Sequence, residues 1–411
     1  MEKTMTSGKY NFLLLAASLV GCSACSTKSS ETGAPSSGSD ADAGTPSGWP
    51  AGTADAVSTY SRIVEASYAD SISTAATLNG ALEALVGSPS EATLDAARVA
   101  WLESREPYLQ TEVYRFYEGP IDNEEDGPEG LLNAWPLDEH YIDYTTDRPN
   151  GGMVNDASVT IDAATLEAAN EFDGDANIAT GYHAVEFLLW GQDLDQDGPG
   201  ARPYTDYVTD GSGTAANQDR RGLYLTTVGD MIVTHLNSVH TQWTEGASYR
   251  TSFEADTAGA VEKILTGMII LSGFETGGER LQAALDSKNQ EEEHSCFSDN
   301  THRDMIQDVQ GIWNVWHGVY KRTDESTVSG TSIKEIVAEF DADLAARVTD
   351  QIDTSLELAN AMPVPFDQAI SEGNVDGNNA VQALVQSLRD QEGLLQDVFD
   401  TLGLSVEIPT E

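Results

Sequence analysis

Two residues that are able to do acid–base or metal chemistry stand inside one of the most apolar stretches of the chain. His183 and Glu186 lie in the run 180–190, and Tyr182 beside them would line the same site. Residues three apart share a face of an α-helix, one turn apart. Burying an imidazole and a carboxylate is costly unless each is paired or binds a metal ion. The spacing therefore predicts either a structural His–Glu hydrogen bond or half of a metal site.

Further donors occur in two segments that precede this run. Glu112 is a candidate carboxylate ligand, and Arg105 and Arg115 are candidate site-lining residues on either side of it. Asp143 is a second candidate ligand, in an acidic loop that also contains Asp138, a candidate lining residue. Carboxylates with one imidazole suit iron or manganese better than copper(I). The alternatives are ion pairs within a helix for the first segment and solvated loop carboxylates for the second.

A third donor-rich segment, 291–304, includes His294 and Asp304. It lacks the paired cysteines of a structural zinc site, and Asp299 or Ser298 is a candidate cap for a helix that starts near residue 301.

Two acidic loops imitate the start of a calcium-binding loop. Residues 193–198 fit its first six positions, but Tyr204 stands where a bidentate glutamate is needed. Residues 122–127 fit similarly, with Asn133 at the last position. Both loops are interpreted as acidic turns, and calcium is a secondary candidate cofactor.

Signatures of known catalytic sites are missing from the sequence. It has no His-Glu-x-x-His motif, no Gly-x-Ser-x-Gly elbow, no P-loop and no dinucleotide fingerprint. We therefore assign no catalytic residue. In a peptidase, Glu186 would be the general base beside a metal-bound water.

The N-terminus has the pattern of an export signal. Two lysines precede an apolar run, 12–20, that is too short to span a membrane. The sequence Leu-Val-Gly-Cys, ending at Cys22, resembles a lipobox, in which the cysteine is acylated. We predict a lipoprotein signal peptide over 1–22, with a plain secretory signal as the alternative, and a disordered tether over 23–53. A lipid on Cys22 would anchor the protein in the cell envelope, in the outer membrane facing the periplasm or at the cell surface.

The charge balance limits the partners. The chain has 21 Lys and Arg against 68 Asp and Glu, a net charge of −47. Such a chain repels nucleic acid and anionic membrane surfaces and attracts cations. Most of these carboxylates are interpreted as a solvated surface.

The elements that position the candidate site are expected to be helices. Apolar residues recur at helical spacing through most of the chain after residue 54, and no sustained alternation indicates strands. Capping boxes are predicted at 88–91 and 332–335, the second opening one long helix, and a polar loop is predicted over 273–300. The fold class is therefore all-α, with two up-and-down bundle halves packed together, roughly 54–215 and 216–405. A duplicated unit is conceivable.

Several blocks resemble the imelysin family, in particular its iron-regulated lipoprotein branch. The family's Gly-x-His-x-x-Glu motif is present at 181–186, and similar blocks lie at 115–122, 133–139, 187–193 and 294–302. The resemblance covers nearly all of the chain from about residue 55. It implies an all-helical fold with a site between the two halves, a metal role for the motif, and an exported or surface-anchored protein tied to iron acquisition.

On this basis we expect a lipoprotein that binds a metal ion, iron, and works with iron-uptake components. His183 and Glu186 would bind the ion, Glu112 and Asp143 would complete the ligands, and the two arginines would orient them or hold an anionic chelate. The resemblance also implies metallopeptidase activity, which is the first alternative. A binding module for haem, a siderophore or a polysaccharide is the second.

Overall fold

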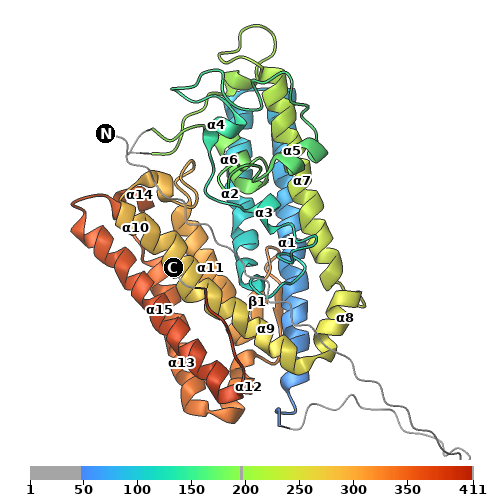
Figure 1. Cartoon of the computed structure of the whole chain (residues 1–411), viewed down its shortest axis with the longest axis vertical. Coiled ribbons are helices and arrows are strands. Elements are labelled where there is room, and N and C mark those ends of the chain that lie inside the picture. Colours follow the sequence, from blue (N-terminus) through green and yellow to red (C-terminus); the bar gives the residue numbers. More distant parts are fainter. Residues whose placement is uncertain (1–47, 195–197, 410–411) are drawn as a thin grey trace, which may run out of the picture. The chain divides into compact units, whose positions relative to one another are not determined.

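Helices are the main elements of the folded chain, and long irregular segments connect some of them (Figure 1). The computed structural model describes residues 48–194 and 198–409. Within these ranges the strands form one short antiparallel hairpin, β1 (Val319–Lys321) with β2 (Thr327–Ser329). The predicted all-α fold is confirmed. The signal peptide with Cys22, and the tether as far as residue 47, lie outside the described residues.

One group of helices comes from the N-terminal part of the folded chain. Its long helices are α1 (Thr53–Gly87), α2 (Glu91–Leu109), α6 (Gly181–Trp190) and α7 (Gln218–Trp243). Helix α1 packs along α2 and α7, and α6 lies against α2 and α7. Short elements connect them: η1 (Glu112–Tyr114), α3 (Glu129–Leu132), α4 (Glu139–Ile142), α5 (Ala163–Ala169) and η2 (Tyr204–Tyr207). The box that caps α2 is formed by Ser90 and Thr93, two residues later than the predicted box at 88–91.

A second group comes from the C-terminal part. Its main helices are α9 (Thr257–Ile269), η3 (Ile270–Gln282), α10 (Ala283–Ser287), α11 (Thr301–His317), α13 (Ala342–Asn360) and α15 (Val375–Leu402). Helix α15 packs against α9, η3 and α13, and α13 packs against α11. Short elements accompany them: α8 (Ser248–Ala255), η4 (Gln290–Glu292), α12 (Ile333–Phe340) and α14 (Phe366–Ile370).

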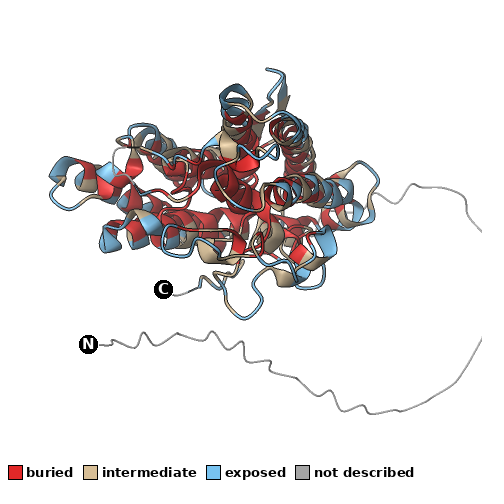
Figure 2. Cartoon of the chain, turned by 90° about the horizontal axis from the view of Figure 1, so that it is seen from above, coloured by how far each residue is buried: buried red, intermediate tan, exposed pale blue. Residues whose placement is uncertain are grey.

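The two groups of helices meet along α11. This helix contacts α2 and η1 of the first group as well as α13 of the second. Buried apolar side chains form one core that runs through both groups and a smaller core between η3, α11 and α15. Figure 2 shows that the buried residues lie on the inward sides of the helices. The helical stretch Thr257–Ser287 is long and apolar enough to cross a membrane, but 61% of its most apolar window is buried inside the fold, as in a core helix.

The predicted polar loop over 273–300 is wrong, because its first part is helical. Helix α9 continues as the π-helix η3 and then as α10. Gly273 allows η3 to lie close to α15, because a Cβ there would be 2.9 Å from Cβ of Glu392 and 2.0 Å from its Oε2. Packing against α15 thus keeps this stretch helical although its glycines disfavour a helix.

The predicted long helix after residue 332 is two helices. The capping box of Ser332 and Glu335 is confirmed at the start of α12. The chain leaves the helical conformation at Asp341, whose carboxylate accepts a hydrogen bond from the N–H of Leu344 and caps α13. An aspartate competes with the helix backbone in this way, so the apolar periodicity alone did not reveal the break.

Candidate metal centre

Helix α6 places the two residues of the motif in the interior. All ten of its residues are buried, because α2, α3 and α7 pack around it. Its first residue, Gly181, has φ +84°, and a Cβ there would lie 2.5 Å from the carbonyl oxygen of Leu132. Only glycine fits this conformation and this close approach. Burial on every side explains why the helix has no polar face apart from His183 and Glu186.

His183 and Glu186 form a hydrogen-bonded pair that a distant residue completes. Nδ1 of His183 is hydrogen-bonded to Oε2 of Glu186 at 2.9 Å. Oε1 of Glu186 accepts from the backbone N–H of Ser298 at 3.0 Å and from its hydroxyl at 2.7 Å. Ser298 lies in the loop before α11, so the second group of helices supplies these donors. The expectation that Ser298 or Asp299 caps α11 is wrong, since Asn300 occupies that position.

Burial makes the charged form of each partner costly. It raises the pKa of Glu186 to about 8, although the hydrogen bonds from Ser298 oppose this shift. It lowers the pKa of His183 well below its ordinary value, and the nearby Arg105 and His294 lower it further. Nε2 of His183 is buried and has no hydrogen-bond partner among the described residues. Such an unsatisfied atom costs about 1–3 kcal/mol, so this nitrogen marks a position where a partner is expected.

A second imidazole–carboxylate pair lies directly beside the first. Nδ1 of His294 donates to Oδ2 of Asp304 at 2.7 Å, and both side chains are buried. The rings of His183 and His294 have centroids 4.8 Å apart and planes inclined by 77°. The same Asp304 oxygen accepts from the hydroxyl of Ser295 and from Arg105 at 3.3 Å. Trp135 covers His183 from another side, with ring centroids 5.0 Å apart.

Arg105 connects these pairs to Glu112 through an amide. Its guanidinium donates to Oδ1 of Asn133 at 2.5 Å, and the amide of Asn133 donates to Oε1 of Glu112 at 3.4 Å. Oε2 of Glu112 accepts from Arg115 and from Arg280, each at 2.6 Å. Burial alone would raise the pKa of Glu112, but these two guanidinium groups outweigh it and lower the pKa to about 2. The structure therefore brings Glu112 into the same buried polar network as His183 but surrounds it with cations.

Asp143 belongs to a different buried cluster. Its carboxylate accepts from Arg202 at 2.8 Å and from Nε of Arg221 at 2.6 Å. Asp138 caps α4 through the N–H of His140 and is exposed. Neither aspartate is in contact with the His183 pair through any of these hydrogen bonds.

Tyr182 lies on the Arg105 side of the network. The guanidinium carbon of Arg105 is 5.2 Å from the centroid of the Tyr182 ring, and the backbone carbonyl of Tyr182 accepts from Trp101 at 2.9 Å. Of the predicted lining residues, Arg105, Arg115 and Tyr182 thus belong to the buried network.

In the acidic loop that starts at Asp122, the first carboxylate stabilises a turn. Asp122 accepts the backbone N–H groups of Phe116 and Gly119 and so fixes the turn at the start of one loop. The other loop, 193–198, lies partly outside the described residues.

Sequence reasoning missed part of the network. His294 and Asp304 belong to a segment noted for its donors, but its relation to His183 depends on the packing of α11 against α2. Arg280 lies in the segment predicted as a loop, and only the π-helix brings it to Glu112 and to Asp308, 2.8 Å away. Within the part of the chain that the structure describes, no group of three or more His, Cys, Asp or Glu side chains is placed to hold a metal ion by itself.

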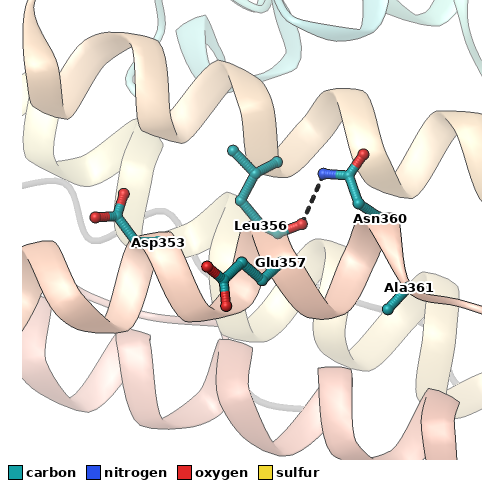
Figure 3. A pocket seen from close by; sticks show the side chains of 5 residues that line it. All are labelled: Asp353, Leu356, Glu357, Asn360 and Ala361. Atoms are coloured by element: carbon teal, nitrogen blue, oxygen red, sulfur yellow. Dashed lines mark hydrogen bonds between the residues drawn. The ribbon is translucent and has the colours of Figure 1, made fainter.

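A surface pocket lies away from the candidate metal centre. Figure 3 shows this pocket of about 520 Å³ on α13, lined by Asp353, Leu356, Glu357, Asn360 and Ala361. None of the predicted site residues lines it.

Known proteins resemble this chain in sequence and in fold. The family model described as Imelysin matches residues 64–395. Iron-regulated protein A of Synechococcus elongatus is 23% identical over 318 residues, which is 74% of each chain.

Two solved structures share the fold. One is described as an iron-regulated protein A precursor from Parabacteroides distasonis, with a TM-score of 0.65, 19% identity, and coverage of 86% of this chain and 97% of the other. The second is an imelysin-like protein from Psychrobacter arcticum, with a TM-score of 0.57, 14% identity, and coverage of 86% and 98%.

Proposed function

This chain belongs to the imelysin family, and on that premise we propose that it is an exported lipoprotein that binds a metal ion, iron, for iron acquisition. The proposed site is the buried centre around His183 and Glu186. The name of its Synechococcus relative, iron-regulated protein A, supports an iron-related role.

The observation that carries this proposal is the unsatisfied Nε2 of His183. A buried imidazole whose Nδ1 donates to a carboxylate presents its other nitrogen as a ligand, and this is the usual arrangement of a metal-binding histidine. This arrangement supports His183 as one ligand of a metal ion. Glu112 and Asp143 are already bound by arginines, so the proposal rests on the α6 pair and not on these two carboxylates.

The lipid anchor at Cys22 is part of the same proposal and rests on the lipobox pattern. An anchored protein of net charge −47 in the cell envelope would concentrate cations near its surface and pass them to a partner in iron uptake.

Elemental analysis of the purified protein tests the proposal. We expect about one iron per chain after exposure to iron salts, and a loss of that iron in His183→Ala. His317→Ala is the matched control, because the Nδ1 of His317 also donates a hydrogen bond, to the carbonyl of Trp313, but on the far end of α11. Equal iron contents in all three proteins would overturn the proposal.

The peptidase alternative receives no support from the geometry of Glu186. Three hydrogen bonds, from His183 and Ser298, occupy its carboxylate, whereas a general base needs an oxygen facing a water. A chelator-sensitive cleavage assay with Glu186→Gln separates the two functions, because a peptidase would lose its activity in this variant.

A further inference from the structure

We propose that the metal ion binds to two imidazole nitrogens, Nε2 of His183 and Nε2 of His294, while Glu186 and Asp304 orient the two rings. This inference rests on the proposed function and narrows it. It assigns the cargo to the divalent first-row transition metals, which for iron means the ferrous ion.

The first step is the orientation of the two rings. Each uses Nδ1 for a carboxylate, His183 for Glu186 at 2.9 Å and His294 for Asp304 at 2.7 Å. A neutral imidazole that donates from Nδ1 carries its lone pair on Nε2. Histidines that bind metals almost always donate their other nitrogen to a carboxylate or a carbonyl. Both rings therefore have the arrangement of metal ligands.

The second step is the availability of both nitrogens. Nε2 of His183 is buried without a partner. No hydrogen bond from the described residues reaches Nε2 of His294, a residue that is 4% exposed. The ring centroids are 4.8 Å apart although the residues come from α6 and from the loop before α11. Two imidazole rings from different elements thus lie side by side, and no described residue hydrogen-bonds the Nε2 of either ring.

The third step is the role of the carboxylates. Ser298 and His183 occupy Glu186, and His294, Ser295 and Arg105 share one oxygen of Asp304. With these hydrogen bonds, the two carboxylates are suited to hold the imidazole rings of His183 and His294 in position. The other oxygen of Asp304 is buried without a partner, so it adds negative charge beside the rings.

The donor set selects the kind of cation. Neutral imidazole suits iron, zinc, copper and nickel in their divalent states, whereas hard cations prefer carboxylate and other oxygen donors. Since no group of three such side chains is placed to hold an ion within the described ranges, water or ligands brought with the metal would fill the remaining positions. A site with two protein ligands suits a cargo that must be released.

Co²⁺ and Cu²⁺ added to the full-length protein test this assignment. We expect one Co²⁺ per chain by titration, and splitting from two equivalent nitrogens in the electron paramagnetic resonance spectrum of the Cu²⁺ form. His183→Gln and His294→Gln should each weaken Co²⁺ binding at least tenfold, and Asp304→Asn tenfold to a hundredfold. His317→Gln should bind as the wild type does. Ga³⁺, a redox-inert substitute for the ferric ion, should bind more weakly than Co²⁺.

The outcomes separate the two proposals. If the wild type binds none of Fe²⁺, Co²⁺, Cu²⁺ and Ga³⁺, the proposed function fails, and this inference fails with it. If His183→Gln abolishes binding but His294→Gln does not, and Cu²⁺ shows one nitrogen, only the inference is overturned. Tighter binding of Ga³⁺ than of Co²⁺ overturns the divalent assignment. If His294→Gln does not fold, the nitrogen count in the wild-type Cu²⁺ spectrum decides the question.

Discussion

Single residues supply the hydrogen bonds that the buried polar atoms around His183 and Glu186 need. Ser298 is the clearest case, because it supplies two of the three hydrogen bonds to Glu186 and comes from a segment more than a hundred residues away. A buried carboxylate that loses a donor keeps its desolvation cost, so removal of the donor is more expensive than the average hydrogen bond suggests.

The change Ser298→Ala should therefore lower the free energy of unfolding by about 1–3 kcal/mol, measured by chemical denaturation. Ser158→Ala is a matched control, since the N–H and hydroxyl of Ser158 also donate to one carboxylate oxygen, that of Asp156, but on the exposed surface. We expect the control to change stability by less than about 0.5 kcal/mol. If both changes lower the free energy of unfolding equally, the burial of Glu186 does not increase the cost of losing this hydrogen bond.

Glu112 should make the protein sensitive to acid. Its pKa of about 2 in the folded state is depressed from an ordinary value of 4.5. A depressed pKa contributes stability that is present above pH 4.5 and is lost as the pH falls toward 2. The contribution is on the order of 3 kcal/mol.

Urea denaturation between pH 2 and 6 measures this contribution. In Glu112→Gln, unfolding should be easier at pH 6, because Arg115 and Arg280 lose their shared partner, and the stability should fall less between pH 4.5 and 2. If the stability of Glu112→Gln falls as steeply as that of the wild type between pH 4.5 and 2, Glu112 is not the source of the acid sensitivity.

At the scale of elements, close approach of backbones sets the position of Glu112. Helix α9 lies against η1, and a Cβ on Gly267 would be 2.1 Å from the carbonyl oxygen of Val113. The carbonyl of Val113 belongs to the backbone and cannot rotate away. Glycine is therefore required at 267 because the two backbones lie so close, and not because of its own backbone conformation. The approach of α9 thus holds the segment that carries Glu112 and Arg115.

Gly267→Ala should destabilise the fold by about 1–3 kcal/mol, because the added methyl group overpacks this contact. Gly80→Ala in α1 is the opposite case, since nothing lies within 4 Å of its Cβ position. Alanine there should stabilise the protein by up to about 1 kcal/mol, the difference in helix propensity. Thermal unfolding of both variants checks this pair, and a stabilised Gly267→Ala would contradict the close approach.

At the scale of the whole molecule, charged contacts and a shared core join the two groups of helices. Arg105 of α2 meets Asp304 of α11, Arg280 of η3 meets Glu112 of η1, and the larger apolar core runs through both groups. The described residues, which begin at 48, also belong to one compact unit. The centre lies where the groups meet, so its geometry depends on both.

The protein should therefore unfold in one cooperative transition. Calorimetric and van't Hoff enthalpies should agree, and Asp304→Asn should shift the single transition to lower temperature, because Arg105 and His294 lose their buried partner. Two separate transitions, with only one affected by Asp304→Asn, would show that the groups of helices fold independently.

Much of the helical architecture could be predicted because it depends on local signals. Apolar residues at helical spacing revealed the long helices, and Ser332 with Glu335 marked a start that the structure confirms. The exceptions are positions where tertiary contacts or a polar side chain compete with periodicity. Examples are η3, which stays helical against α15, and Asp341, which divides a predicted helix.

The sequence by itself determined that His183 and Glu186 share one face of a buried helix, because their spacing and apolar surroundings are local properties. It also indicated the family through blocks of residues in order. Only the tertiary structure decided which partners these residues have. Ser298 and His294 reach α6 because α11 packs on α2, and Asp143 turns to two arginines instead. Contacts between residues a hundred positions apart depend on how helices pack, and helical periodicity contains no information about that.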